Sequence, residues 1–496
     1  MNNLLPAFIA VPLGAAFLML PAARLNRKLP DWLGNLTVLY LLGAAVALYF
    51  FRPFNNIILY NLGGWVAPIG VTLVLDGLSH LLLLIINLAA FIITFYSVTY
   101  MRQYHGRDKY YSLLMLMIAG MNGVVLTGDL FNLFVFLELA AISSAALVAF
   151  GTEAEEMEAA FKYLIMGTIA SVMILFGIAI IYAITGTLSM ADVSRSFPAA
   201  AVGIKSFVAV LFLIGFCTKA AIVPFHAWLP DAHPAAPGPV SAMLSGVLIK
   251  ALGIYALARI FFNVLGMSQQ ISGILMVLGA ISILAGVLLA LWQWDLKRLL
   301  AYHSISQIGY IVLGLGLFTP LGIMGALFHL FNHALFKPLL FLNAGAIEYA
   351  SGTRELKKLG GLAKSMPVTF VTSLFASMSI AGIPPFNGFW SKLFIILACV
   401  QAGQIGFALV AVIGSILTLA SFLKVMKYAF FDHSRLPEPE KIKEVPWMMG
   451  SAMIVFALLC ILAGIAFPAV TNYLVNPAVV ALMNGAGYGK MVLGGL

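Results

Sequence analysis

The segment FCTKAAIVPFHAWLPDAHPAAPGPVSAM, residues 216–243, combines two features that would be costly inside a membrane. Lys219 places a charge within an apolar run, and Pro224 and Pro230 follow it. A charged side chain at mid-helix costs at least about 2.5–3.5 kcal/mol, so it usually faces a cavity or a partner. Proline breaks the helical hydrogen-bond ladder, and the freed carbonyls are tolerated at membrane depth only beside protein or water. The segment therefore predicts a broken helix beside a hydrated cavity.

The composition of the whole chain agrees with a location in the membrane. Of 496 residues, 62% are hydrophobic and only 9% are charged, which is too few to cover the surface of a soluble protein of this size. Apolar runs of about 20 residues recur from end to end, each long enough to cross the bilayer as a helix. The alternation of polar and apolar residues that marks a membrane barrel is absent. We therefore expect an all-α integral membrane protein with about fourteen transmembrane helices, centred near residues 13, 41, 85, 118, 140, 173, 213, 250, 280, 309, 334, 384, 417 and 457.

The net charge of +9 is explained by position rather than by binding to nucleic acid. Lysine and arginine collect in the loops that follow odd-numbered spans, and such loops stay on the cytoplasmic side. The predicted topology is a multi-pass protein of the cell inner (plasma) membrane, within the lipid bilayer, with both termini outside. The basic residues that set it are Arg24, Arg27, Lys28, Arg102, Arg107, Lys109, Lys297, Arg298, Arg354, Lys357, Lys358, Lys364, Arg435, Lys441 and Lys443.

The sequence contains no sign of a redox or hydrolytic centre. Cys217, Cys399 and Cys460 are isolated within apolar spans, so no zinc, haem or cluster spacing can be built from them. No nucleotide-binding fingerprint follows a strand, and no extramembrane domain is evident. We expect no cofactor, no metal and no catalytic site within this chain, although it could serve as the pumping subunit of a redox-driven complex.

Five charged residues lie deep in different spans: Glu138, Lys219, Lys250, Lys337 and Lys392. A single lysine of this kind is commonly a snorkelling side chain or half of a structural ion pair. Four lysines and a glutamate in five separate spans favour a functional set instead. A buried lysine holds its proton more firmly beside a carboxylate than alone, so a lysine and Glu138 that move together and apart would capture and release protons.

A second proline break lies five spans after the first. The run AGIPPFNG, residues 381–388, directly precedes Lys392. Two interrupted helices at matching places in successive five-helix blocks are typical of inverted transporter repeats. We therefore predict repeats formed by spans 4–8 and 9–13. The corresponding division of the chain is residues 1–109, 110–262, 263–431 and 432–496.

Span eleven contains a stripe of ionisable residues in FHLFNHALFKPLLF. His329, His333 and Lys337 are spaced four apart, which places them on one helical face. Such a stripe can pass protons, because histidine titrates near neutrality. The spacing of the two histidines is also that of a zinc-protease helix, but Leu330 stands where the glutamate is required. A structural role for one histidine remains an open alternative.

Several other polar residues have two interpretations each. Asp129 is predicted to cap span five, with proton acceptance as the alternative. Lys162 follows an acidic loop and is expected to snorkel or to form an ion pair there. Asp76 and His80 are expected to contact a neighbouring subunit or a structural partner. The polar residues of the broken segment, which are a proton access site or partners for exposed backbone, are His226, Asp231 and His233.

Five motifs resemble the antiporter-like subunits shared by respiratory complex I, membrane-bound hydrogenases and Mrp-type Na+/H+ antiporters. The resemblance covers about residues 70–430. It implies fourteen helices with two inverted five-helix repeats. It also implies that Glu138 pairs with Lys219, that Lys250 bridges the halves, and that Lys392 ends a polar axis to which His329, His333 and Lys337 belong. The motifs are GDLFNLFVFLELAAISS, TKAAIVPFHAWLPDAHPAAPGPVSAMLSGVLIKALGIYAL, LAYHSISQIGY, FHLFNHALFKPLLFLNAGAI and SIAGIPPFNGFWSKL.

Within this family, the phrase YAITGTLSMADVS and the chain length resemble the D-type subunit of Mrp antiporters most closely. Lys392 stands where one complex I branch has glutamate. The resemblance therefore implies a proton-translocating subunit that works with other membrane subunits, with protons as substrate and sodium left open. The alternative is the corresponding pumping subunit of complex I or of a membrane-bound hydrogenase. A quinone-reducing enzyme and a stand-alone permease for another solute are the less favoured classes.

Overall fold

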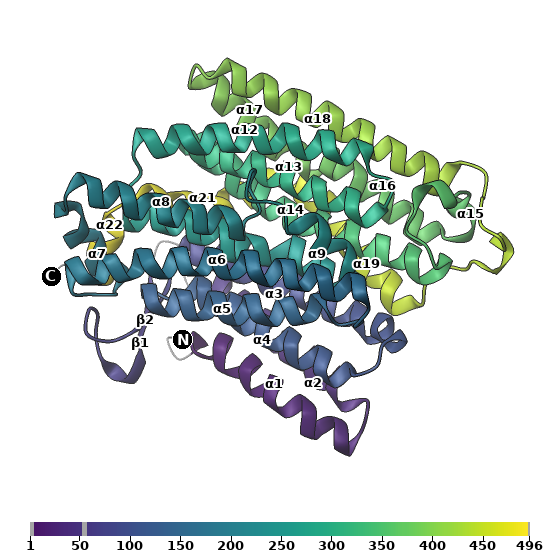
Figure 1. The fold of residues 1–496 in the computed structure, drawn as a ribbon, viewed down its shortest axis with the longest axis horizontal. Coiled ribbons are helices and arrows are strands. Elements are labelled where there is room, and N and C mark those ends of the chain that lie inside the picture. The colour runs from purple at the N-terminus through teal and green to yellow at the C-terminus, as the bar shows by residue number, and fades with distance from the viewer. Residues whose placement is uncertain (1–3, 52–56, 495–496) are drawn as a thin grey trace.

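The computed structural model describes residues 4–51 and 57–494, which form one bundle of roughly parallel helices (Figure 1). Thirteen helices of the described part are long and apolar enough to cross a membrane, and each contains one predicted span centre. The all-α membrane fold expected from composition is confirmed. The thirteen are α1 (Ala7–Leu25), α2 (Leu29–Phe51), α3 (Gly77–Tyr100), α4 (Arg107–Leu126), α5 (Leu130–Val148), α6 (Ala154–Thr185), α8 (Val202–Lys219), the segment 238–264, α12 (Gln269–Trp292), α13 (Leu296–Gly316), α14 (Pro320–Ser351), the segment 405–431 that begins with α18 (Ile405–Val425), and α19 (Trp447–Ile465).

The fourteenth predicted span is present as two shorter helices. Its predicted centre, near residue 384, falls in the gap between α16 (Pro367–Ala381) and α17 (Asn387–Gln401). The first proline segment also breaks its helix, because α8 ends at Lys219 and the chain becomes helical again only in α9 (Leu229–Ala235). Both breaks predicted from proline are confirmed.

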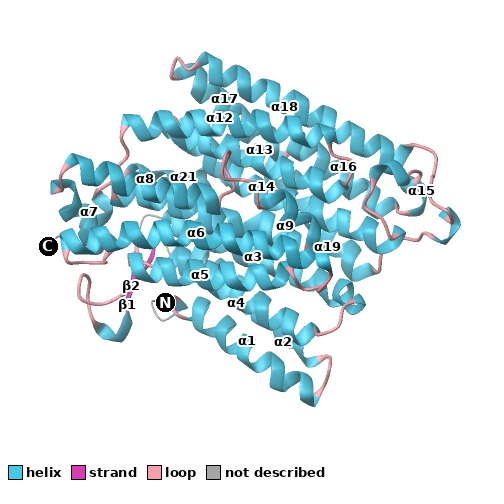
Figure 2. Cartoon of the chain, in the orientation of Figure 1, coloured by secondary structure: helices cyan, strands magenta, loops and turns pink. Residues whose placement is uncertain are grey.

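Three features of the fold were not predicted. Segment 238–264 is largely π-helical, with α10 (Gly238–Met243), η5 (Leu244–Leu248), η6 (Lys250–Tyr255), α11 (Ala256–Ala258) and η7 (Arg259–Val264). A small antiparallel hairpin pairs β1 (Ile58–Asn61) with β2 (Thr72–Leu75) (Figure 2). The C-terminal tail is helical; part of it packs on α3, as α20 (Phe467–Val470), η11 (Thr471–Val475), α21 (Asn476–Met483) and α22 (Gly487–Val492). The remaining short helices are η2 (Leu62–Gly64), η3 (Met101–Gln103), α7 (Met190–Ser196), η4 (Phe197–Ala199), η8 (Leu356–Lys358), α15 (Leu362–Ser365), η9 (Met426–Phe431) and η10 (Pro439–Lys441).

Two helix pairs begin at positions that correspond at a constant distance along the chain. Asp129 caps α5 and Asp295 caps α13, 166 positions later. Helices α6 and α14 both contain 32 residues, and each ends at a left-handed glycine with φ 70° and ψ 6°. An isolated β-bridge ties each capping aspartate to the strand-like residue after the second helix. The backbone of α5–α6 is therefore built like that of α13–α14.

The centre of the bundle consists of two helical segments that lipid does not reach. The apolar windows of α14 and of segment 238–264 are completely buried within the protein, whereas those of α1, α6 and α18 are mostly exposed. Polar side chains on α14 and in segment 238–264 must therefore be satisfied by the protein itself or by water inside it.

A buried ion pair ties this centre to α3. The guanidinium of Arg259 contacts both carboxylate oxygens of Asp76 at 2.7 Å, and the carboxylate also caps α3 by accepting a hydrogen bond from the backbone of Ser79. The aromatic ring of Tyr488 in α22 lies 5.0 Å from the guanidinium carbon. Of the two alternatives for Asp76, the structural partner is the one found.

We expect Asp76→Asn to destabilise the fold strongly, because it leaves a buried guanidinium without its counter-charge. The cost of breaking a buried pair is about 3–5 kcal/mol. Thermal unfolding of the solubilised protein measures it, and Asp432→Asn in the more exposed pair with Arg435 is the control, with a cost below about 1 kcal/mol. Equal melting temperatures for the two variants would contradict a stabilising role for the Asp76 pair.

Candidate functional site

Glu138 and Lys219 form an ion pair between α5 and the last residue of α8. The Lys219 ammonium nitrogen lies 3.3 Å from Glu138 Oε1. Ser171 of α6 donates a hydrogen bond to the same oxygen, so three helices meet at this carboxylate. The side chain of Lys219 is 4% exposed and that of Glu138 is 25% exposed. The predicted pairing of the span-five glutamate with the span-seven lysine is thus a contact in the structure.

Lys250 is completely buried and is held by backbone oxygens. Its ammonium nitrogen donates to the carbonyls of Ser245 and Gly246, each at 2.6 Å. Both carbonyls belong to the π-helical segment η5. A π-helix changes the register of backbone hydrogen bonds, which makes carbonyl oxygens available to a side chain. The irregular segment 238–264 therefore accommodates a charge in the centre of the bundle.

Lys337 of α14 is also completely buried and bonds to a neighbouring helix. Its ammonium nitrogen lies 2.5 Å from the carbonyl oxygen of Leu300 in α13 and 5.5 Å from the centre of the Phe341 ring. The next residue, Pro338, packs against Gly246 so closely that a Cβ at Gly246 would lie 2.3 Å from the proline ring. This contact holds α14 against η5, the segment that binds Lys250.

The two histidines of α14 continue from Lys337 toward the second broken helix. The ring centres of His329 and His333 are 6.4 Å apart, and His329 Nδ1 lies 2.9 Å from Ser391 Oγ in α17. Lys392, the next residue, donates to the carbonyl of Ile380 at 2.8 Å, at the C-terminal end of α16. The predicted stripe on α14 and the lysine beside the second break therefore meet at Ser391 and Lys392.

The seven predicted residues form three groups rather than one chain of direct contacts. In the described part of the protein, no hydrogen bond joins Lys219 to Lys250 or Lys250 to Lys337. Lys250 and Lys337 are nevertheless neighbours, because Gly246, whose carbonyl accepts a hydrogen bond from Lys250, packs against Pro338, and His333 lies one turn before Lys337 on α14. The groups are Glu138 with Lys219, then Lys250 with Lys337 and His333, and finally His329 with Lys392.

Several buried polar atoms around these groups have no hydrogen-bond partner among the residues that the structure describes. Both ring nitrogens of His333 are unpaired, as are both polar atoms of the Gln307 and Asn387 side chains and one atom of Asn332. Buried polar groups are nearly always hydrogen-bonded, to protein or to ordered water. The sequence analysis did not select Gln307, Asn332 or Asn387, although their presence within apolar spans was the signal that could have found them.

His233 lies between Lys337 and the end of the bundle at which Lys297 and Arg354 are found, which we call the basic end. It is completely buried in α9, both ring nitrogens lack a protein partner, and its ring centre is 5.7 Å from that of Phe341. Two basic side chains bind the backbone next to His233. Arg354 donates a hydrogen bond to the carbonyl of Pro234 at 2.8 Å, and Lys297 donates one to the carbonyl of Ala236 at 3.3 Å.

These two cations line a cavity of about 550 Å³. Lys297 pairs with Glu348 at 2.5 Å, and Arg354 pairs with Glu155 at 2.9 Å. Glu153 and Glu156 also line the cavity, so it contains acidic and basic side chains in contact.

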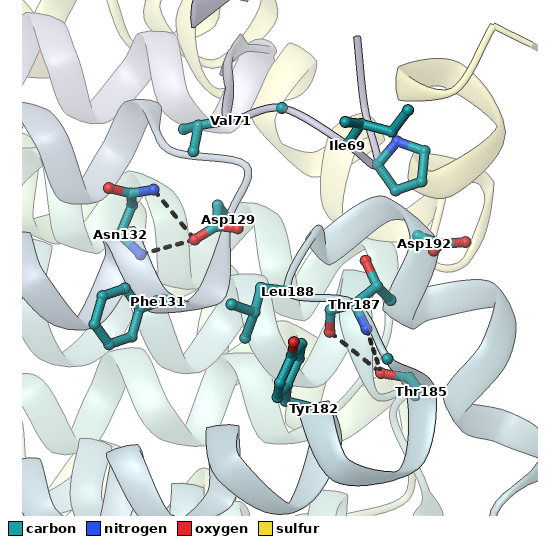
Figure 3. Close-up of a pocket in the computed structure, with 13 residues that line it drawn as sticks. Ile69, Val71, Asp129, Phe131, Asn132, Tyr182, Thr185, Thr187, Leu188 and Asp192 are labelled. Carbon is teal, nitrogen blue, oxygen red and sulfur yellow. Dashed lines mark hydrogen bonds between the residues drawn. The ribbon is translucent and has the colours of Figure 1, made fainter. Parts of the chain in front are cut away.

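Asp129 and Lys162 each have contacts that agree with one of their two interpretations. Asp129 accepts from the backbone and side-chain nitrogens of Asn132 at 2.8 and 3.2 Å, beside a cavity of about 570 Å³ (Figure 3). It is thus the helix cap, and burial raises the pKa of its carboxyl. Lys162 pairs with Glu158 at 2.7 Å and with Asp231 at 3.1 Å. The described residues contain no cluster of three or more histidine, cysteine or acidic side chains that would hold a metal ion.

The comparisons with known proteins agree with this arrangement. Residues 127–418 match the family described as NADH:quinone oxidoreductase/Mrp antiporter, TM, and residues 65–111 match the region described as NADH-Ubiquinone oxidoreductase (complex I), chain 5 N-terminus. The chain is 34% identical to the D-type Na(+)/H(+) antiporter subunit of Alkalihalophilus pseudofirmus, over 94% of this chain and 95% of the relative. It is 39% identical to the N-type NADH-quinone oxidoreductase subunit of Desulforudis audaxviator, over 79% of each. A chain of the Mrp complex from Dietzia sp. superposes with a TM-score of 0.93 at 30% identity, covering 99% of both chains.

The fold and the buried groups define a multi-pass membrane protein that carries ionisable side chains through its interior. The chain belongs to the NADH:quinone oxidoreductase/Mrp antiporter family, and its similarity to the D-type subunit of Mrp antiporters extends over nearly the whole length. The resemblance found in the sequence motifs is confirmed. The bacterial relatives support a location in the plasma membrane, and the solved relative is itself a chain of a complex.

The contact between α14 and η5 gives a prediction about the site. Gly246→Ala should push Pro338 away and cost about 1–3 kcal/mol of stability, as other overpacked interiors do. Gly273→Ala is the matched control, because a Cβ there meets no atom within 4 Å. Thermal unfolding of both variants tests this, and a Gly246→Ala protein as stable as the Gly273→Ala protein would contradict the close packing.

Proposed function

We propose that this chain is the proton-translocating, D-type subunit of a multisubunit Na+/H+ antiporter. The observation that carries the proposal is a set of ionisable side chains that crosses the interior in three neighbouring groups. Its order along the path is Glu138, Lys219, Lys250, Lys337, His333, His329 and Lys392. Protons are the substrate of this path, and sodium exchange belongs to the assembled complex.

Proton capture and release follow from the geometry of the ion pair. At the 3.3 Å separation of Lys219 and Glu138, and with an effective dielectric constant of about 20, the attraction is on the order of 5 kcal/mol. One elementary charge that crosses 100 mV gains about 2.3 kcal/mol. Opening or closing this pair therefore changes the affinity of Lys219 for its proton by an amount comparable with the driving force.

Transfer between the groups requires water, and unpaired polar atoms support its presence. His333, Gln307, Asn332 and Asn387 all bear buried atoms without a protein partner. Each such atom would cost about 1–3 kcal/mol if it stayed unsatisfied. Water bonded to these atoms would bridge the gap between Lys337 and His329.

We also propose that His233 connects the path to the basic end of the bundle. It lies two positions before Ala235, which lines the cavity together with Lys297 and Arg354, and its ring faces the Phe341 ring that Lys337 also contacts. Of the two interpretations of the broken segment, proton access is thus the one that the position of His233 favours.

The constant spacing of 166 residues supports the division into two repeats, residues 110–262 and 263–431. The helix caps and β-bridges of α5–α6 correspond to those of α13–α14, and α6 and α14 have the same length. Because the second block follows after five spans, it runs in the opposite direction through the membrane. Residues 1–109 and 432–496 flank the repeats.

Replacement of Lys219 tests the path. We expect Lys219→Ala to reduce Na+-dependent pH recovery in everted vesicles that contain the whole complex by at least tenfold, because the carboxylate loses its exchanging partner. Lys205→Ala is the matched control, since Lys205 is in the same helix but bonds only to a surface carbonyl of Pro198. Unchanged transport by an assembled Lys219→Ala complex would refute the proposed path.

The same vesicle assay distinguishes the two candidate complexes, a Na+/H+ antiporter and a redox-driven pump. The 39% identity to a subunit of an NADH-quinone oxidoreductase favours a redox-driven pump as the second candidate. An antiporter recovers pH in response to Na+ without any electron donor. A pumping subunit acidifies the vesicles only when a donor is supplied and does not respond to Na+.

The proposed topology has both termini on the outer side. We expect alkaline phosphatase, which is active only outside the cytoplasm, to be active when it is fused after α22. Green fluorescent protein inserted between η9 and α19, beside Arg435 and Lys441, should be fluorescent because that loop is cytoplasmic. The reverse pattern would invert the predicted orientation.

A further inference from the structure

At the basic end of α1–α3, a polar cavity and an apolar groove lie side by side and share two lining residues. The cavity measures about 650 Å³ and the groove about 750 Å³, both within the range of roughly 300–1,000 Å³ that is typical of ligand sites. Arg102 and Arg107 line both of them, so they mark the junction. An ion pair of 2.9 Å with Asp31 fixes Arg107 there.

The polar cavity carries a positive field. The two spaces together are lined by five basic side chains and by only two acidic ones, and Asp31 is already engaged with Arg107. In the described part of the chain, neither Arg27 nor Arg102 forms an ion pair. The basic residues are Arg24, Arg27, Lys28, Arg102 and Arg107, and the acidic ones are Asp31 and Asp108.

The groove has the opposite character. Its floor is α3, against which both α2 and α19 pack, and its walls are apolar and aromatic. Trp32 and Trp447 stand at its basic end with 67% and 72% of their surface exposed, as tryptophan does at the boundary of a bilayer. The ring of Trp447 packs edge-on against Phe95 at 5.8 Å. The other apolar residues of the groove are Leu36, Leu39, Phe91, Val98 and Met448.

We infer that this composite site binds an anionic glycerophospholipid from the leaflet at the basic end. The phosphate group occupies the polar cavity between Arg27 and Arg102, and an acyl chain lies in the groove along α2 and α3. Charge complementarity selects the occupant, because basic pockets at membrane helix ends favour anionic headgroups and a zwitterionic headgroup brings its own cation. This site lies outside the buried path and is independent of the proposed transport function.

The inference is tested by lipid titration of the purified complex with native mass spectrometry. Phosphatidylglycerol should bind at least tenfold more tightly than phosphatidylcholine with the same acyl chains. The double variant Arg27→Gln/Arg102→Gln should abolish this preference, because each removed charge lowers the affinity for phosphatidylglycerol about fivefold. Lys109→Gln is the matched control. Lys109 is a basic residue at the same end of the bundle, but it lines neither space.

A second variant tests the groove and keeps the experiment decisive. Leu39→Trp fills the apolar wall and should weaken both lipids while leaving the headgroup preference intact. A double variant that keeps its preference for phosphatidylglycerol would overturn the inference. Full competition by soluble glycerol phosphate would also overturn it, because it would indicate a simple anion site. A helix of another subunit bound in the groove of the intact complex would overturn it as well.

Discussion

A charged ammonium group inside an apolar bundle requires oxygen atoms, and irregular helices supply them here. Lys250 donates hydrogen bonds to two carbonyls of the π-helical η5. Lys392 donates to a carbonyl at the end of α16, and Lys337 donates to the carbonyl of Leu300 in α13. The last carbonyls of a helix have no intrahelical partner, and the helix dipole makes that end negative. Lys250 and Lys392 therefore depend on local departures from regular α-helix, and the positions of these departures determine where their charges lie.

The two ends of the bundle use one backbone design for different purposes. At one end, Asp129 caps α5 beside a cavity whose walls include Phe131, Tyr182 and Leu188 (Figure 3). At the other end, the positions 166 residues later are occupied by charged side chains that form ion pairs, namely Lys297, Glu348 and Arg354. The capping and bridging contacts are the same in both places. Similar scaffolds thus carry a cavity with three apolar or aromatic side chains at these positions at one end of the bundle and an ionic cavity at the other.

The sequence predicted what depends on strong local rules. Span positions follow from apolar length, and the two breaks follow from proline, so both agree with the structure. The pairing of Glu138 with Lys219 came from the resemblance, because residues 81 positions apart carry no local signal. The π-helical segments were not predictable, because apolar length and composition do not distinguish a π-helix from an α-helix. Ser171 was missed because a serine in an apolar helix usually forms a hydrogen bond with its own backbone.

Within the described residues, the set of buried groups is most exposed at Glu138, whereas Lys392 at its other end is 3% exposed. The carboxylate side chain of Glu138 is 25% exposed on the face of α5, whereas Lys250, His333 and Lys337 are completely enclosed. A charge placed against that face would act on the pair with Lys219 through little intervening protein, and a few kcal/mol suffices to change its proton occupancy. Of the charged groups in this set, the pair is therefore the one on which the surroundings of the chain act most directly.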